Sequence, residues 1–95
     1  MRAKSPEEIV LRPLITEKTL RIAERENAYT FQVDRNANKV QVRDAIERLF
    51  SVSVTDVRTQ NMMGKFRRMG RSFGATSNWK KAVVKVKEGD TIEFY

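Results

Sequence analysis

The segment from Gly64 to Lys81 holds the chain's densest group of residues suited to binding phosphates. It has six basic residues and no acidic one, together with three glycines, two phenylalanines and a tryptophan. Basic side chains pair with phosphates, aromatic rings stack on unpaired bases, and glycines allow close backbone approach. The segment therefore predicts contact with RNA, and a solvated hairpin tip without a ligand is the alternative. The candidate RNA-binding residues are Lys65, Phe66, Arg67, Arg68, Arg71, Ser72, Trp79, Lys80, Lys81 and Lys85. For Trp79 alone, packing on the domain is as well supported as stacking on a base.

The stretch GKFRRMGRS superficially resembles a nucleotide-binding P-loop. A P-loop needs four residues between its glycines, followed by lysine and then serine or threonine. Here five residues separate Gly64 from Gly70, and Arg71 stands where the lysine is required. The glycines also do not lie between a predicted strand and a predicted helix. These differences exclude a nucleoside-triphosphate site.

Catalytic chemistry has little to build on, because the chain contains no histidine and no cysteine. Histidine is the commonest general base and transition-metal ligand, and cysteine is needed for disulfides and for most zinc sites. The carboxylates fall mainly on predicted helix surfaces near basic residues, as ordinary solvated charges do. We therefore predict no catalytic residue, no metal and no cofactor, and an enzyme is the least favoured class.

The formal charge of +7 indicates a polyanionic partner, either nucleic acid or an anionic membrane surface. Residues 1–50 hold ten basic and eight acidic residues, whereas residues 51–95 hold nine and four. A membrane surface is the weaker alternative, because no predicted helix combines a strongly apolar face with a basic one. The chain has no signal-like start, and no apolar run approaches the roughly 20 residues of a membrane span. We expect a cytoplasmic protein that does not insert into a membrane.

The pattern along the chain predicts the elements that position the basic segment. The first twelve residues are expected to be a flexible lead-in that ends at Pro13. A helix should begin after Thr16, a strand should cover 29–33, and a second helix should follow Asn38 with a capping box to Gln41. Further strands are expected at 53–63, at 79–87 and in the final TIEF. The change of parity between Val54 and Val57 indicates either a bulge or a weak strand boundary there.

This order predicts an α+β fold with a split β-α-β arrangement, in which a right-handed crossover leaves room for the last main strand between two parallel ones. We expect a two-layer sandwich: a mainly antiparallel sheet with both helices on one face, and a long basic hairpin loop. Residues 1–95 should form a single domain, with the extended basic loop at 64–78. The other face of the sheet should carry Lys81, Lys85 and Lys87.

Three stretches resemble a known family: PLITEKTL at 13–20, NKVQVRDAIERLFSVSVTDVRT at 38–59, and WKKAVVKVKEGDTIEF at 79–94. They are similar to the bacterial form of the universal large-subunit ribosomal protein L twenty-three family, and the likeness covers residues 11–95. Val86 departs mildly from this family's pattern, which tends to have leucine there.

The resemblance implies a structural constituent of the large subunit that binds ribosomal RNA beside the nascent-peptide exit tunnel. The segment 64–78 matches the family's loop, which extends along RNA into the tunnel wall next to the nascent polypeptide. Glu17, in Thr16-Glu17-Lys18, matches the glutamate that helps to dock the chaperone trigger factor, and it also suits the start of a helix by itself. Neighbouring ribosomal proteins, the signal recognition particle and the translocon are further implied partners. A stand-alone RNA chaperone or regulator with the same sheet is the alternative function.

Overall fold

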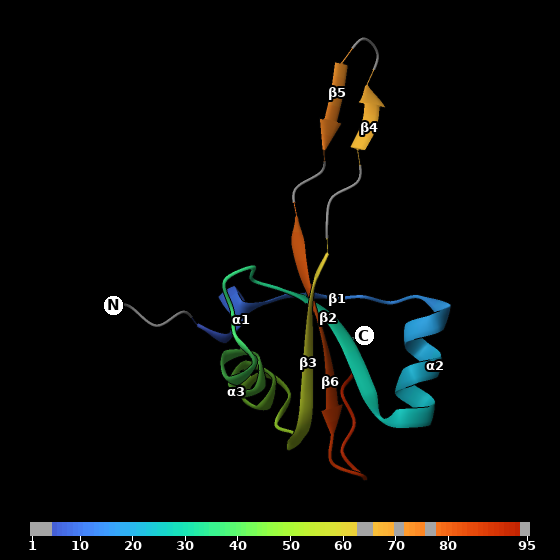
Figure 1. Cartoon of the computed structure of the whole chain (residues 1–95). Helices are drawn as coiled ribbons and strands as arrows, with labels where there is room; N and C mark the ends of the chain where they lie inside the picture. The colour runs from blue at the N-terminus through green and yellow to red at the C-terminus, as the bar shows by residue number, and fades with distance from the viewer. Residues whose placement is uncertain (1–4, 63–65, 70–71, 76–77, 94–95) are drawn as a thin grey trace.

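The computed structural model describes residues 5–62, 66–69, 72–75 and 78–93 (Figure 1). The elements follow in the order α1 (Pro6–Ile9), β1 (Val10–Pro13), α2 (Glu17–Glu26), β2 (Ala28–Val33), α3 (Lys39–Phe50), β3 (Val54–Met62), β4 (Phe66–Met69), β5 (Ser72–Ala75) and β6 (Trp79–Val86).

The main sheet has four strands in the order β1-β2-β6-β3, and each neighbouring pair is antiparallel. The strands β2 and β3 are therefore parallel to each other, with β6 between them, which is the predicted split β-α-β arrangement. Phe31 pairs with Ala82 across β2 and β6, and Val57 pairs with Val84 across β3 and β6. The bulge, one of the two alternatives expected near Val54, is confirmed, because the register shifts between Val54 and Asp56.

The helix α3 supplies most of the helical side of the core. Its start is the predicted capping box: the Asn38 side chain accepts from the Gln41 backbone N–H at 2.8 Å, and the Gln41 side chain accepts from the Asn38 N–H at 2.9 Å. The stripe of Val42, Ala45 and Ile46 is buried against the sheet. The rings of Phe50 and Phe31 lie 5.7 Å apart between centroids, so helix and sheet interlock.

The helix α2 packs against the core less closely than α3 does. The Thr16 side chain caps it by accepting from the Thr19 N–H at 3.2 Å, as predicted, and it ends at Asn27 with a left-handed φ of 54°. None of its residues is buried, and Ala23 packs only partly against the core.

Figure 1 shows α2 beside β2, across the sheet from α3 and α1. The α+β class is confirmed, but the expectation that both helices cover one face of the sheet is wrong. The helices α3 and α1 lie over the core face, whereas α2 lies on the opposite side, where its last residue, Glu26, lines a small cavity with Arg58 and Val83.

Two local expectations are wrong. From Pro6 on, the expected flexible lead-in is ordered as α1 and the edge strand β1, because Ile9 and Val10 are buried in the core. The expected final strand is not formed in Thr91–Glu93, although Ile92 is only 5% exposed and packs into the core. Ile92 is therefore apolar because it is buried, and not because it belongs to a strand.

The basic segment contains a second, two-stranded sheet. β4 pairs with β5 in antiparallel register, and Arg68 lies opposite Phe73. Figure 1 shows this hairpin beyond the ends of β3 and β6, away from the helices. The expected hairpin is therefore present, with part of its length in strands.

Candidate nucleic-acid interface

The two faces of β6 differ sharply in character. Side chains alternate along a strand, and the set on one side, Ala82, Val84 and Val86, is at most 2% exposed. The alternate set begins at Trp79 and continues through Lys81, Val83 and Lys85, all of them partly or fully exposed. The predicted site residues Trp79, Lys81 and Lys85 thus share the face that points away from α3.

The strands on either side of β6 add polar side chains to that face. Gln32 of β2 and Gln60 of β3 are both paired with Lys81, and Arg58 is paired with Val83. The Arg58 side chain is 83% exposed. We call this surface the open sheet face; its residues are Gln32, Arg58, Gln60, Met62, Trp79, Lys81 and Lys85.

Arg58 is a candidate contact that sequence reasoning missed. Alternation counted from Val54 would assign the even-numbered positions, and with them Arg58, to the core side. The bulge between Val54 and Asp56 reverses the alternation, so that Val57 is buried and Arg58 faces outward. The change of parity between Val54 and Val57 was the available signal.

Charge is not uniform along the open sheet face. Near Lys85, the Asp56 carboxylate lies 3.5 Å from Nε of Arg58, and Glu26 lines the same small cavity. At this end the two acidic residues, Asp56 and Glu26, therefore balance the two basic residues, Arg58 and Lys85. The excess of positive charge lies toward Lys81, on the side from which the hairpin extends.

Lys80 does not join the other predicted residues. It belongs to the opposite side of β6, and its Nζ donates a hydrogen bond to the Ala37 carbonyl oxygen at 2.6 Å. This contact ties β6 to the turn that precedes α3. A structural role for Lys80 is therefore better supported than a contact with RNA.

The remaining predicted contacts are in the hairpin. Phe66, Arg67 and Arg68 belong to β4, and Ser72 begins β5. Lys65 and Arg71 lie outside the described residues.

Glu17 belongs to a separate surface. It is the first residue of α2 and is exposed. Two large apolar side chains near it in sequence are also exposed, Ile15 at 52% and Leu20 at 45%. Exposed apolar groups beside a charged residue are a composition found at sites of contact with other proteins.

The described residues form neither a candidate metal site nor a helix that could span a membrane. Within the part of the chain that the structure describes, no group of three or more acidic residues is placed to hold a metal ion. The described helices are all too short or too polar to cross a membrane.

Fold and surface together define a small basic α+β protein with one face and one hairpin suited to a polyanion. A family model described as Ribosomal protein L23 matches residues 8–94. The large ribosomal subunit protein uL23 of Roseiflexus sp. strain RS-1 is 52% identical to this chain over 91 residues, which cover 96% of both proteins. The protein of the same name from Geobacter metallireducens is 47% identical over 88 residues, which cover 93% of this chain and 94% of that protein. The one from Sorangium cellulosum is 52% identical over 91 residues, covering 95% of this chain and 93% of that protein.

The chain belongs to the Ribosomal protein L23 family. It is thus a structural ribosomal protein and not an enzyme, as expected from the sequence. Membership of this family also supports the expected cytoplasmic, ribosome-associated location.

Proposed function

We propose that this protein binds the RNA of the large ribosomal subunit through the open sheet face and the β4–β5 hairpin. The observation that carries the proposal is the grouping of Trp79, Lys81 and Arg58 on one exposed face, from whose end the hairpin extends (Figure 1). In this proposal residues 1–95 act as one domain, with 64–78 as an extension that follows the RNA.

Electrostatics sets the expected behaviour of this contact. The hairpin segment contributes Lys65, Arg67, Arg68 and Arg71, and the open sheet face adds further cations. Neutralising about six phosphates releases bound counterions, so the affinity falls steeply as the salt concentration rises.

The proposed location is beside the nascent-peptide exit tunnel, with the hairpin lining the tunnel wall. Two features support this location: the family resemblance, and a hairpin that extends beyond the sheet and away from the helices (Figure 1). Neighbouring ribosomal proteins and the nascent polypeptide would then be further contacts. The signal recognition particle and the translocon would dock nearby.

The second part of the proposal concerns Glu17, which would help to dock trigger factor. Its support is the match of Thr16-Glu17-Lys18 to the family element, together with the exposed apolar side chains of Ile15 and Leu20. An exposed carboxylate in the first turn of a helix can pair with a basic residue of a partner while it stabilises the helix.

The test of RNA binding compares the wild-type protein with the triple variant Arg67→Ala, Arg68→Ala and Arg71→Ala. We expect the affinity for large-subunit ribosomal RNA to fall with rising salt, with a shallower salt slope in the variant. Arg43→Ala on α3, which removes an exposed cation from the helical side, is the control and should bind as the wild type does. Salt-insensitive binding, or equal binding by the triple variant, would contradict the proposal.

Sedimentation separates a ribosomal constituent from a stand-alone RNA chaperone or regulator. A constituent should co-sediment with the large subunit in near-equal amount. Family membership favours the first outcome, and recovery mainly in free or unrelated RNA fractions would contradict it.

A further inference from the structure

A cavity of about 480 Å³ lies where the sheet meets the base of the hairpin. Its apolar lining comes from Leu11 of β1, Val33 of β2 and Trp79 of β6. Its polar lining comes from the end of β2, the following turn and the residue before β6: Gln32, Asp34, Arg35, Asn36 and Asn78. Because β2 lies between β1 and β6, the cavity spans the end of β2. Its volume is within the roughly 300–1,000 Å³ of pockets that bind small ligands.

The polar wall of the cavity is held in place by hydrogen bonds. The Asp34 N–H donates to the Ile9 carbonyl oxygen at 2.8 Å, and the Asn36 N–H donates to Oδ1 of Asp34 at 3.1 Å. At the other end of the turn, the Ala37 carbonyl oxygen accepts from Lys80. A wall fixed in this way loses little conformational entropy when a ligand binds.

The amide of Gln32 is oriented by its neighbour. Nε of Arg12 donates to Oε1 of Gln32 at 2.7 Å, which assigns the other end of the amide as the donor. Among the described residues, no hydrogen bond uses the Gln32 NH₂ group, so it is available to an acceptor in the cavity.

We propose that this cavity binds one unpaired nucleobase of RNA, stacked on the indole of Trp79. Gln32 and Asn36 would hydrogen-bond the edge of the base, and Arg35 would pair with the adjoining phosphate. The inference rests on the proposed RNA-binding function and adds to it a subsite for a single base.

The composition of the cavity favours a base over other ligands. An aromatic ring beside amide side chains and an arginine is the combination that recognises splayed-out bases of single-stranded RNA. The carboxylate of Asp34 accepts from a backbone N–H within its own turn, and Arg35 follows it directly in the chain. Lys81, next on the same face of β6, continues the cavity into the surface proposed to contact RNA.

The chain offers a direct probe, because Trp79 is its only tryptophan. We would titrate the full-length protein at low salt with a short oligouridylate, and with an abasic oligoribonucleotide that has the same number of phosphates. Stacking should quench Trp79 fluorescence with the oligouridylate alone. The oligouridylate should also bind roughly tenfold more tightly than the abasic oligomer, within the range observed for one base stacked on an aromatic side chain.

Gln32→Ala should lower the affinity for the oligouridylate more than the affinity for the abasic oligomer, and so reduce the difference between the two. The matched control is Gln60→Ala, since Gln60 also pairs with Lys81 but does not line the cavity. It should preserve the difference.

Equal binding of both oligomers without quenching would overturn the base subsite and leave the phosphate-binding proposal standing. Equal loss of the difference in both glutamine variants would also overturn the assigned cavity. If neither oligomer binds, the RNA-binding function proposed above fails, and the subsite fails with it.

Discussion

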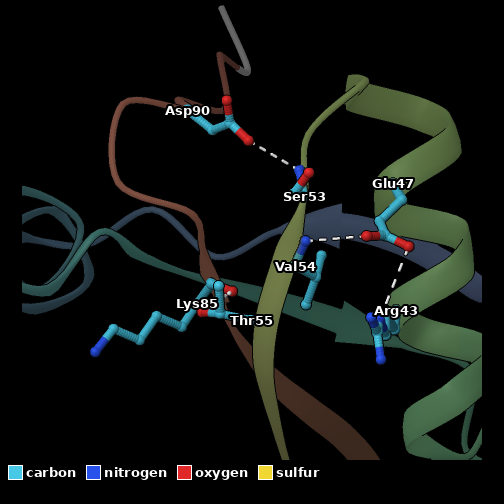
Figure 2. Close-up of polar contacts among 7 residues, drawn as sticks. All are labelled: Arg43, Glu47, Ser53, Val54, Thr55, Lys85 and Asp90. Atoms are coloured by element: carbon cyan, nitrogen blue, oxygen red, sulfur yellow. Dashed lines mark hydrogen bonds and ion pairs between the residues drawn. The ribbon is translucent and has the colours of Figure 1, made fainter.

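Glu47 of α3 and Val54 of β3 are joined by a hydrogen bond from the Val54 backbone N–H to Oε2 of Glu47, 3.0 Å long (Figure 2). The same carboxylate lies 3.9 Å from Nε of Arg43 through its other oxygen. Next to it, the Ser53 N–H donates to Oδ2 of Asp90 at 2.9 Å. Val54, the first residue of β3, is thus fixed to α3, and Ser53 just before it is fixed to the turn after β6. Both contacts lie directly before the bulge that sets which side chains reach the open sheet face.

Glu47→Ala should lower the free energy of unfolding by about 1–3 kcal/mol, because the part-buried N–H of Val54 loses its acceptor. Arg43→Ala should cost less than about 1 kcal/mol, since the Arg43 side chain is 58% exposed and its contact with Glu47 is long. Urea denaturation followed by circular dichroism measures both. Equal losses in the two variants would mean that the ion pair, and not the bond to the backbone, stabilises this junction.

Substitution of Asn27 should also lower the stability of the fold. Its Nδ2 is within hydrogen-bonding distance of the carbonyl oxygens of Val86, Lys87 and Asp90, at 3.0–3.4 Å, and its φ of 54° is left-handed. Asn27→Ala loses these bonds and adds backbone strain, so we expect a destabilisation of about 2 kcal/mol.

Asn27→Gly loses the same hydrogen bonds without the strain of a left-handed φ, and should be less destabilising than Asn27→Ala by up to about 1 kcal/mol. Thermal unfolding of the two variants measures this difference. Equal melting temperatures would argue that the left-handed conformation carries no cost here.

Lys80 and Lys81 are adjacent in sequence but should respond in opposite ways to substitution by glutamine. Lys81→Gln removes a charge from the open sheet face, so the affinity for ribosomal RNA should fall severalfold while stability changes little. Lys80→Gln disturbs the bond to Ala37, so stability should fall by about 1 kcal/mol with a smaller effect on RNA affinity. The assignment of faces would be wrong for this pair if Lys80→Gln weakened RNA binding more than Lys81→Gln did.

Glu17→Ala should weaken the recruitment of trigger factor to ribosomes and leave subunit assembly intact. Glu24→Ala, which removes another exposed acid from α2, is the matched control. Co-sedimentation of the chaperone with purified ribosomes measures the effect. Unchanged recruitment would show that Glu17 serves only the helix, where it contributes about 0.3–1 kcal/mol.

Sequence patterns predicted the helices and strands whose signals lie within a short stretch of the chain. The N-cap at Thr16, the capping box at Asn38, the apolar stripe of α3 and the alternation in β2 each involve residues within one or two turns or one strand. Such patterns indicate structure before any tertiary contact is known. The strand β1 was missed because an edge strand of four residues carries little periodicity, and its burial depends on distant partners.

The composition of the basic segment and the alternation of β6 were sufficient to predict Lys81 and Lys85 on a face opposite the core. Arg58 was missed although the change of parity that turns it outward was visible in the sequence. The separate role of Lys80 required the tertiary structure, because it depends on a bond across 43 positions of the chain. By itself the sequence determined a basic α+β protein with a hairpin rich in arginine. Only strand pairing decided which cations share one face, because a shift of register by one residue moves every side chain of a strand to the other side of the sheet.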